Sequence, residues 1–438
     1  MPNQTIPFML RPPSFVSNAL TRLIDAGYEA LIVGGALRDT VLNRPIPDWD
    51  IATSAPCERI KDLFSDRKTY HLRHETVTIV LPGNRLEITP YRDPHGTLIE
   101  DLARRDFTIN AMAYDSLRKN LIDPWEGRKD LAQRVIRATR DPDLRFREDP
   151  VRLLRGIRFA TELGFEIHPQ TRHAMEAHAH LLSRVARERI REELIKLLMC
   201  PHPSRGFRTL SDSGMLKQII PELCEGKGVE QNIHHQYTVF DHALETVERV
   251  PPVLHLRLAA LLHDIAKPRV RTPEGDTWRF LDHASESAHL TVQIMARLRF
   301  SRLLTEKVAH LIGIHMVEYT SQWTDGAIRR LIRKAGRENI NDLLALRKAD
   351  LLAHGTGSER TGSLEELQKR VTSALQNKQA PSIHELAING HDVMELLHLE
   401  PGPHIGNVLQ HLLEIVTDKP RLNNREDLLA LLKKSPLP

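Results

Sequence analysis

The most constraining feature of this chain is a short apolar segment that enters a pair of glycines and precedes two closely spaced aspartates. Residues 31–33 predict a buried strand, Gly34 and Gly35 a turn, and residues 36–42 a helix. Asp48 and Asp50 follow about ten residues later. Side chains at positions i and i+2 of a strand project from one face, so we expect these two carboxylates side by side.

Two carboxylates on one face repel each other unless a cation lies between them. Oxygen ligands suit a hard divalent ion such as Mg²⁺. The glycine turn exposes backbone N–H groups that can approach a phosphate closely. The combination predicts an α/β domain that performs two-metal phosphoryl or nucleotidyl transfer. The alternative is an ordinary pair of solvated turn residues, which most isolated Asp-x-Asp sequences are.

Length and composition bound the class of protein. At 438 residues the chain should form several domains, and its 41% hydrophobic and 27% charged residues are typical of globular proteins. No apolar run reaches the ~18–20 residues that span a bilayer, so we expect no contact with a membrane. Cys57, Cys200 and Cys224 are widely spaced, and the first residues lack a secretion signal. We therefore expect reduced thiols and a cytoplasmic location.

The pattern of secondary structure changes along the chain. Further strands are expected at residues 76–81 and 85–90, joined by a hairpin turn, with extended segments at 108–114 and 120–123. From Asp149 onward the sequence reads as nearly continuous amphipathic helix. The predicted fold is therefore α+β, with an α/β head followed by an all-helical remainder.

Arg104, Arg105 and Asp106 stand together before an apolar segment. Arg105 is a candidate to bind a triphosphate, since a guanidinium suits bidentate phosphate contacts. Asp106 is a candidate to accept a hydrogen bond from a ribose hydroxyl. The other interpretation is a surface Arg–Asp pair before a strand.

Asp149, Arg152, Arg155 and Arg158 follow one another every three residues in an Arg-rich stretch, so they follow one side of a predicted helix. A carboxylate beside a guanidinium matches a base edge that carries an amino donor next to a ring-nitrogen acceptor. Cytosine and adenine share this edge, whereas guanine and uracil present the reverse. We therefore expect selection of C and A without a template. Phosphate binding is the simpler role, which we assign to Arg155 and Arg158.

Together these motifs resemble those of the bacterial tRNA nucleotidyltransferases, the class II CCA-adding and poly(A) polymerase family. The resemblance covers about residues 25–225. It rests on Gly34-Gly35, Arg38-Asp39, Asp48-x-Asp50, Arg104-Arg105-Asp106, Asp123-Pro124, Gly127, Asp130-Leu131 and Glu148-Asp149-x-x-Arg152, in the order and spacing typical of the family.

The resemblance implies a polymerase-beta-like head in which a tRNA 3′-hydroxyl attacks the α-phosphorus of CTP or ATP. Asp48 and Asp50 would be the catalytic Mg²⁺ ligands. The triphosphate would bind at the Gly34-Gly35 turn, Arg38 and Arg105. Asp149 and Arg152 would read the base, supported by Arg155 and Arg158. Contacts with the tRNA acceptor end would be made largely to its backbone and would be salt-sensitive.

Residues 94–99 form a shorter loop than complete CCA-adding members carry between Asp93 and Glu100. A short loop is typical of the subclass that adds CC only, so the resemblance leaves CC, CCA and A addition open. Poly(A) polymerases are also close relatives of this family and remain an alternative.

A second set of residues resembles the HD phosphohydrolase superfamily over residues 236–354. His242, His263-Asp264 and Asp350 occur in the ligand order of that superfamily. Imidazole and carboxylate ligands suit Mn²⁺, Ni²⁺ or Mg²⁺. His283, with Glu286 nearby, and His315 match positions where some members add ligands or phosphate contacts. The alternatives are a scaffold without activity and a phosphohydrolase that acts on RNA ends or nucleotides.

The expected domain order follows from these motifs. We predict a nucleotidyltransferase head at residues 1–135, a helical neck at 136–228, an HD domain at 229–355 and a helical tail at 356–438. A stand-alone phosphohydrolase with a nucleotide-binding head, and a non-catalytic RNA-binding protein, are the competing hypotheses. The intact carboxylate pair and the complete set of head motifs argue against both.

Overall fold

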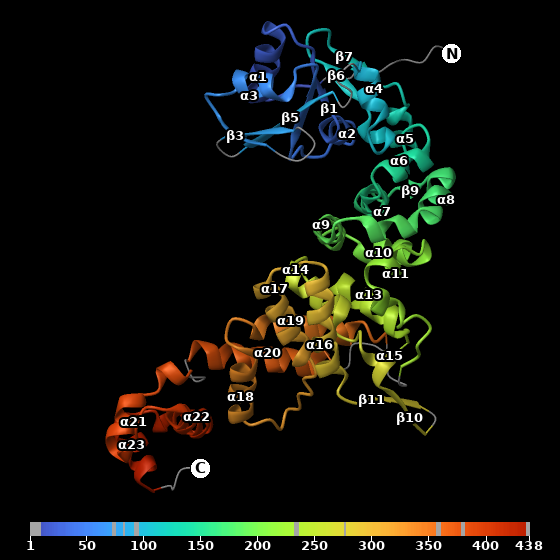
Figure 1. The fold of residues 1–438 in the computed structure, drawn as a ribbon. Coiled ribbons are helices and arrows are strands. Elements are labelled where there is room, and N and C mark those ends of the chain that lie inside the picture. Colours follow the sequence, from blue (N-terminus) through green and yellow to red (C-terminus); the bar gives the residue numbers. More distant parts are fainter. Residues whose placement is uncertain are drawn as a thin grey trace. The chain divides into compact units, whose positions relative to one another are not determined.

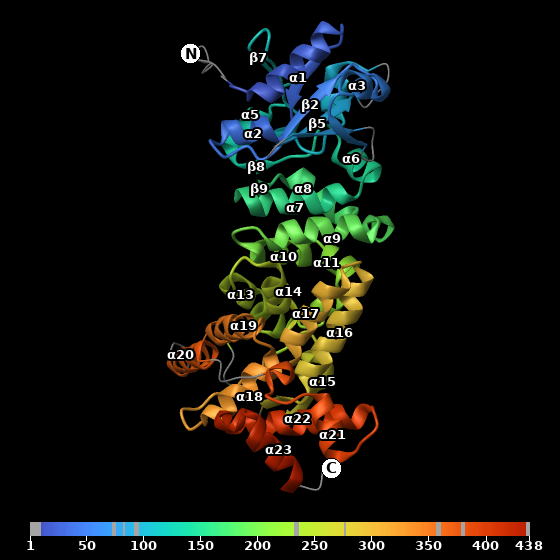
Figure 2. The ribbon, with the colours of Figure 1, turned by 90° about the vertical axis from the view of Figure 1, so that its left-hand side faces the viewer.

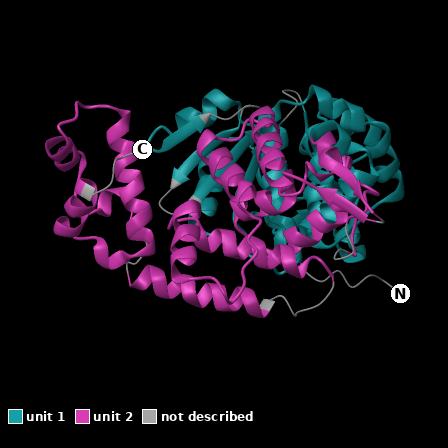
Figure 3. Ribbon diagram, turned by 90° about the horizontal axis from the view of Figure 1, so that it is seen from below, with its two compact units in different colours: residues 1–219 teal, residues 220–438 magenta. Residues whose placement is uncertain are grey.

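The computed structural model describes residues 10–71, 76–81, 84–91, 96–231, 236–275, 277–355, 361–377 and 382–434. Its contacts divide the chain into two units, residues 1–219 and 220–438 (Figure 3). This division lies near the domain boundary predicted after residue 228. The boundaries predicted after residues 135 and 355 fall inside the units and stay predictions.

A seven-stranded sheet forms the first part of unit 1 (Figure 1). Its order is β3-β4-β5-β2-β1-β6-β7, and β2 and β5 are the parallel neighbours. The strands of unit 1 are β1 (Ala30–Val33), β2 (Trp49–Thr53), β3 (Lys68–His71), β4 (Val77–Leu81), β5 (Asn84–Pro90), β6 (Ala113–Asp115), β7 (Asn120–Ile122), β8 (Val135–Ile136) and β9 (Glu166–Ile167). The last two pair with each other outside this sheet.

Both faces of the central strands are covered, which explains why residues 30–33 are apolar without alternation. Leu31 and Val33 pack in one cluster with Ala52 and with Leu102 of helix α4 (Leu98–Ala103). Helices α1 (Ser14–Asp25) and α3 (Cys57–Leu63) also contact the sheet. The sheet is therefore a rigid support for side chains at the ends of its strands.

The rest of unit 1 is mainly helical. Its remaining helices are α2 (Gly35–Val41), η2 (Thr108–Asn110), α5 (Gly127–Gln133), α6 (Pro142–Glu148), α7 (Val151–Leu163), α8 (Pro169–Ala177), η3 (Ala179–Arg184), α9 (Arg187–Leu198), α10 (Pro203–Asp212) and α11 (Met215–Ile219). Helix α7 packs against α9 and α10, and Figure 2 shows α7 and α9 side by side.

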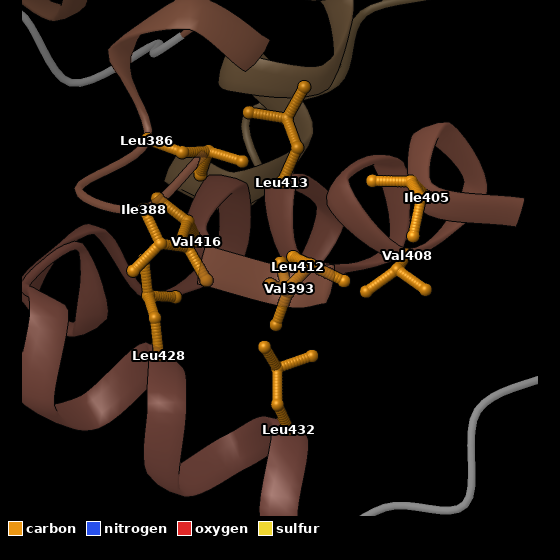
Figure 4. Close-up of a cluster of buried hydrophobic side chains, with 10 residues drawn as sticks. All are labelled: Leu386, Ile388, Val393, Ile405, Val408, Leu412, Leu413, Val416, Leu428 and Leu432. Atoms are coloured by element: carbon orange, nitrogen blue, oxygen red, sulfur yellow. The ribbon is translucent and has the colours of Figure 1, made fainter. Parts of the chain in front are cut away.

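The described residues of unit 2 are helical apart from one hairpin, β10 (Arg271–Glu274) with β11 (Thr277–Phe280). Its helices are α12 (Pro221–Cys224), α13 (Val239–Arg249), α14 (Leu254–Leu262), α15 (Lys267–Val270), α16 (His283–Arg297), α17 (Arg302–Gly313), α18 (Asp325–Ala335), α19 (Ile340–Leu352), α20 (Thr361–Gln376), η5 (Ile383–Glu385), α21 (Gly390–Leu397), α22 (Pro403–Asp418), η6 (Pro420–Leu422) and α23 (Arg425–Lys434). Figure 4 shows the apolar cluster that joins α21, α22 and α23.

The predicted α/β head is confirmed, and the remainder is mostly helical, with two corrections. The prediction of an all-helical remainder is wrong at β9, which pairs with β8, and at β10 and β11, which pair as an antiparallel hairpin. The extended segment predicted at residues 108–114 is also wrong at its start, since η2 is a 3-10 turn and only β6 is a strand.

Three further expectations concern the short loop at residues 94–99, contact with a membrane, and the cysteines. Pro94 and His95 of the predicted short loop lie outside the described residues, and Thr97 caps helix α4. Within the described ranges, each helix is too short or too polar to cross a bilayer. The three cysteines are free thiols, and Cys200 is buried.

Candidate functional site

Three carboxylates lie near one end of the sheet. Asp50 of β2 is the register partner of Val33 on β1 and of Glu87 on β5, so all three side chains project from the same face. Asp48 precedes β2 and is exposed. Burial raises the pKa of Glu87, and the charges of Asp50 and Asp48 raise it further. The sequence therefore identified two members of a group that contains at least three.

The electrostatics of Asp50 show why a cation is favoured here. Burial raises the pKa of Asp50, Arg105 opposes that rise, and the charge of Asp48 adds to it. Arg155 and Arg38 also lower the pKa of this carboxyl, which places both guanidiniums within electrostatic reach. Clustered carboxylates of this kind gain stability from a bound divalent cation.

Gly34 brings the backbone against this group. It has a φ of 76°, a conformation that favours glycine. A Cβ at this position would lie 3.0 Å from Asp50 Oδ2 and 3.2 Å from Arg105 Nη1. The glycine turn, the Asp50 carboxylate and Arg105 thus lie together at one point. At Gly35, the next residue, a Cβ would stand 3.5 Å from Arg38 Nη2.

Arg38 is buried and held by three groups. It donates two hydrogen bonds to Asp39, at 3.0 and 2.9 Å, and one to Asn110 Oδ1 at 3.0 Å. Its guanidinium also lies 5.1 Å from the ring centre of Phe159. The side chain is therefore fixed beside the glycine turn. Asn110 was not predicted, because only η2 brings it to Arg38.

Asp106 accepts three hydrogen bonds and makes one further ion-pair contact with Arg155. Its Oδ1 accepts from the backbone N–H of Phe107 at 2.8 Å and from Asn110 Nδ2 at 3.2 Å, while Oδ2 pairs with Arg155. Burial alone would raise the pKa of Asp106, but the charge of Arg155 and these hydrogen bonds hold it well below its usual range. Because its acceptor positions are filled, contact with a ribose hydroxyl, which stays a prediction, requires Arg155 to move.

The arginines of α7 have different partners. Arg152 donates to the carbonyls of Arg104 and Arg145, at 2.8 and 3.2 Å, and to Glu148 at 3.2 Å. Arg155 binds Asp106, as described above. Arg158 is buried against Glu193 of α9 at 2.7 Å and Glu162 at 3.0 Å.

These contacts give the arginines predicted to follow one side of α7 different roles. Arg152 lies within one residue of Arg105, because it binds the carbonyl of Arg104, and so the base-reading and triphosphate candidates are neighbours. Arg158 instead ties α7 to α9. Its predicted phosphate role remains a prediction that this ion pair does not favour.

Asp149 lies between α6 and α7 in extended conformation and is paired with a residue that the sequence did not single out. Arg189 of α9 donates from Nη1 to Oδ1 at 2.9 Å and from Nη2 to Oδ2 at 2.8 Å. The two residues are forty positions apart. A charge pattern alone could not select Arg189 from the other arginines of α9, and only the packing of α9 on α7 does so.

A separate histidine cluster lies in unit 2 and consists of His242, His263, Asp264, His283, His315, Asp350 and His354. The cluster is buried, and three overlapping groups of its ligand atoms each lie within 4.8 Å of one another. The structure thus brings together the four predicted ligands with His283 and His315, which the sequence also singled out, and it adds His354.

Hydrogen bonds orient these imidazoles. Four of them place Nδ1 against a backbone carbonyl, which leaves Nε2 to face the carboxylates. The four pairs are His242 with Ala353 at 3.3 Å, His263 with Ala260 at 2.9 Å, His283 with Phe280 at 2.8 Å, and His315 with Ile312 at 2.7 Å. Metal-binding histidines are held in this way in many proteins.

The carboxylates of the cluster each face both cations and imidazoles. Asp264 binds Lys267 through Oδ2 at 2.6 Å, and its Oδ1 lies 3.5 Å from His283 Nε2. Neither Asp264 Oδ1 nor His283 Nε2 has a hydrogen-bond partner in the described part of the chain. Burial alone would lower the pKa of His263, but Asp264 and Asp350 raise it to about 10. Converging imidazole and carboxylate atoms with unsatisfied members fit a divalent transition metal.

Comparison with known proteins relates both units to one class. Residues 30–137 match the model "Poly A polymerase head domain", and residues 164–226 match "Probable RNA and SrmB-binding site of polymerase A". Residues 272–432 match the model of tRNA nucleotidyltransferase domain 2.

Individual relatives cover nearly the whole chain. The A-adding tRNA nucleotidyltransferase of Deinococcus radiodurans is 35% identical over 88% of this chain and 91% of the relative. The CC-adding tRNA nucleotidyltransferase of Thermus thermophilus is 33% identical over 92% and 93%. The crystal structure of the Bacillus stearothermophilus CCA-adding enzyme in complex with CTP superposes with a TM-score of 0.74 at 28% identity, covering 97% of this chain and 98% of that one.

Proposed function

Because the chain belongs to the tRNA nucleotidyltransferase family, we propose that it transfers CMP or AMP from CTP or ATP to the 3′ end of tRNA. The observation that carries this proposal is the convergence of Asp50, Gly34 and Arg105 at the end of the sheet. Glu87 and Asp48 complete an acidic group beside them. Carboxylates, a glycine turn and arginines are the groups that nucleotidyl transfer requires.

In this proposal Asp48, Asp50 and Glu87 supply the oxygen ligands for Mg²⁺. An Mg²⁺ ion held by these residues would lower the pKa of the attacking hydroxyl and neutralise charge on the phosphates. The tRNA 3′-hydroxyl gives its proton to solvent as its oxygen forms a bond to the α-phosphorus, and the bond from the α-phosphorus to the bridging oxygen breaks to release pyrophosphate. Gly34, Gly35, Arg38 and Arg105 hold the triphosphate. Because Asp39 and Asn110 already fix Arg38, little side-chain entropy is lost when phosphate binds.

Selection of the base rests on Asp149 and Arg152. A carboxylate accepts from the amino group of cytosine or adenine, and a guanidinium donates to the adjacent acceptor. The hydrogen bond from Arg152 to the carbonyl of Arg104, the neighbour of Arg105, supports this assignment. Base selection and phosphate binding are therefore carried by adjacent parts of unit 1.

The length of the extended tRNA distinguishes CC addition, CCA addition, A addition and poly(A) synthesis. Relatives of this chain include A-adding and CC-adding enzymes, and the short segment at residues 94–99 favours CC addition. The test is to incubate the protein with Mg²⁺, labelled CTP or ATP, and tRNA that lacks its terminal CCA. Products two nucleotides longer support CC addition, products three longer support CCA addition, and A added only to tRNA ending in CC supports an A-adding enzyme. Long adenylate tails would support a poly(A) polymerase, and no incorporation would contradict the proposal. The proposed location is the cytoplasm, as expected from the sequence.

A second candidate activity is a metal-dependent phosphohydrolase at the histidine cluster. The unsatisfied atoms of Asp264 and His283 favour it, because buried polar atoms without partners are uncommon. The site would bind Mn²⁺, Ni²⁺ or Mg²⁺ and act on phosphate esters such as 2′,3′-cyclic phosphates at RNA ends. Hydrolysis of a 2′,3′-cyclic nucleotide that is lost in His263→Ala, but retained in Asp48→Ala, would support it. Absence of hydrolysis with all three metals would contradict it.

A further inference from the structure

Asp149, which we propose reads the base, is paired with Arg189. Asp149 is not part of a helix, and its side chain is about one quarter exposed, at 26%. A carboxylate on extended backbone can turn about two side-chain torsions. It can discriminate between bases only if its oxygens face the incoming base in one fixed orientation.

Arg189 supplies that orientation. Its two terminal nitrogens bind the two oxygens of Asp149 at 2.9 and 2.8 Å, which aligns the planes of the two groups. Each carboxylate oxygen has two acceptor positions. The second position on Oδ1 faces the Val151 N–H at 3.4 Å, whereas Oδ2 accepts only from Arg189 among the hydrogen bonds of the described residues. One acceptor position, on Oδ2, is therefore left for a ligand.

Helix α9 is itself fixed to α7. Glu193 lies one turn after Arg189, so both side chains are on the same face of α9. Glu193 accepts a hydrogen bond from the buried Arg158 at 2.7 Å. This buried ion pair fixes the position of α9, and Arg189 thereby reaches Asp149 from a rigid helix.

We propose that Arg189 is a positioning residue for nucleotide selection, which holds the Asp149 carboxylate so that one Oδ2 acceptor position faces the base amino group. This inference rests on the proposed function. An oriented acceptor gains a hydrogen bond from cytosine or adenine, and it meets a carbonyl oxygen on uracil or guanine. Without Arg189 the carboxylate can turn away, so discrimination falls while the metal-binding carboxylates are unchanged.

The test measures kcat and KM for CTP, ATP, UTP and GTP with the full chain and tRNA lacking CCA. For Arg189→Ala we expect the KM for CTP and ATP to rise about tenfold or more, with a smaller change in kcat. The ratio of kcat/KM for CTP over UTP should fall by about the same factor. Arg189→Lys should restore part of the ratio, since an ammonium can bind the carboxylate but cannot fix its plane. Glu188→Ala, at an exposed neighbouring position on α9, is the matched control.

A double variant distinguishes positioning of Asp149 by Arg189 from a purely structural role of the pair. If Arg189 acts through Asp149, adding Arg189→Ala to Asp149→Asn should not change the nucleotide ratio further. Equal losses with all four nucleotides, or an unchanged CTP to UTP ratio in an active Arg189→Ala protein, would overturn the inference. If Arg189→Ala does not fold, as judged by its melting curve, Arg189→Gln carries the same test. A wild-type chain that incorporates no nucleotide would overturn the proposed function as well, so the two failures are distinguishable.

Discussion

Asp50 on β2 and Glu87 on β5 are direct register partners in the parallel strand pair of the sheet. They lie 37 positions apart in the sequence, yet their carboxyl groups project from the same face, close enough for the charge of Asp50 to raise the pKa of Glu87. Only the pairing of β2 with β5 brings them together. Glu87 should therefore act with Asp48 and Asp50 rather than as a surface residue.

The first prediction concerns Glu87→Gln. Loss of the negative charge should lower kcat for CMP incorporation by about 100-fold, because a metal-binding oxygen is weakened, while the KM for tRNA stays similar. Labelled-CTP incorporation measures this effect. Glu58→Gln, an exposed position on α3, is the control and should be fully active. Wild-type kcat in Glu87→Gln would show that Glu87 is not part of the group.

Gly34→Ala tests the close approach of backbone and carboxylate. The new Cβ would lie 3.0 Å from Asp50 Oδ2 and in a left-handed conformation, so both activity and stability should fall. The matched control is Gly27→Ala, which has a φ of 85° but open space around its Cβ. Both should lose about 1 kcal/mol of stability through strain, whereas only Gly34→Ala should raise the KM for CTP. Equal kinetic effects in the two variants would contradict the prediction.

The Asp106–Arg155 pair predicts an acid dependence of stability. Burial raises the folded-state pKa of Asp106, but the charge of Arg155 and the hydrogen bonds outweigh burial and lower it. The stabilisation by the pair is therefore complete above the unfolded-state pKa near 4 and declines as the pH falls. Asp106→Asn should cost about 2 kcal/mol at pH 7, less than a fully buried pair because Arg155 is partly exposed. The stability difference from wild type should stay constant from pH 7 to about pH 5 and shrink below about pH 4. Denaturant titrations at several pH values check this, and a difference that grows on acidification would contradict it.

Metal removal tests the histidine cluster without any activity assay. After treatment with a chelator, addition of Mn²⁺ or Ni²⁺ at about 100 times its Kd should raise the melting temperature of unit 2 by about 5 °C or more. The shift should vanish in His263→Ala and persist in His289→Ala, an exposed control on α16. Equal shifts in the two variants would mean that the metal binds elsewhere.

Local sequence patterns predicted the parts of the site that are formed by residues close together in the sequence. The strand at residues 31–33, the turn at Gly34 and the carboxylates of Asp48 and Asp50 lie within about twenty positions, and the structure places Gly34 and Asp50 in contact range. The three-residue spacing singled out Asp149, and the resemblance to a known family added the distant histidine ligands. These parts were predictable because a single strand and turn, or a recurring motif, specify them.

Contacts with residues on strands or helices that are distant in the sequence could not be predicted from local patterns. Glu87 becomes a member of the acidic group through strand pairing, and Arg189 reaches Asp149 through helix packing. Spacing placed Arg158 on the same side as Arg152 and Arg155, but Glu193 on α9 determines its actual contact. The hairpin β10–β11 was missed because its strands are short and none of their residues is buried, which gives little apolar signal.

The most direct test of the central claim compares wild type with Asp48→Ala on tRNA lacking CCA, with Mg²⁺ and labelled CTP and ATP. The wild type should add nucleotides to the 3′ end. Asp48→Ala should add none while keeping the melting shift with Mn²⁺, because the histidine cluster lies in the other unit. Extension by Asp48→Ala at the wild-type rate would contradict the account.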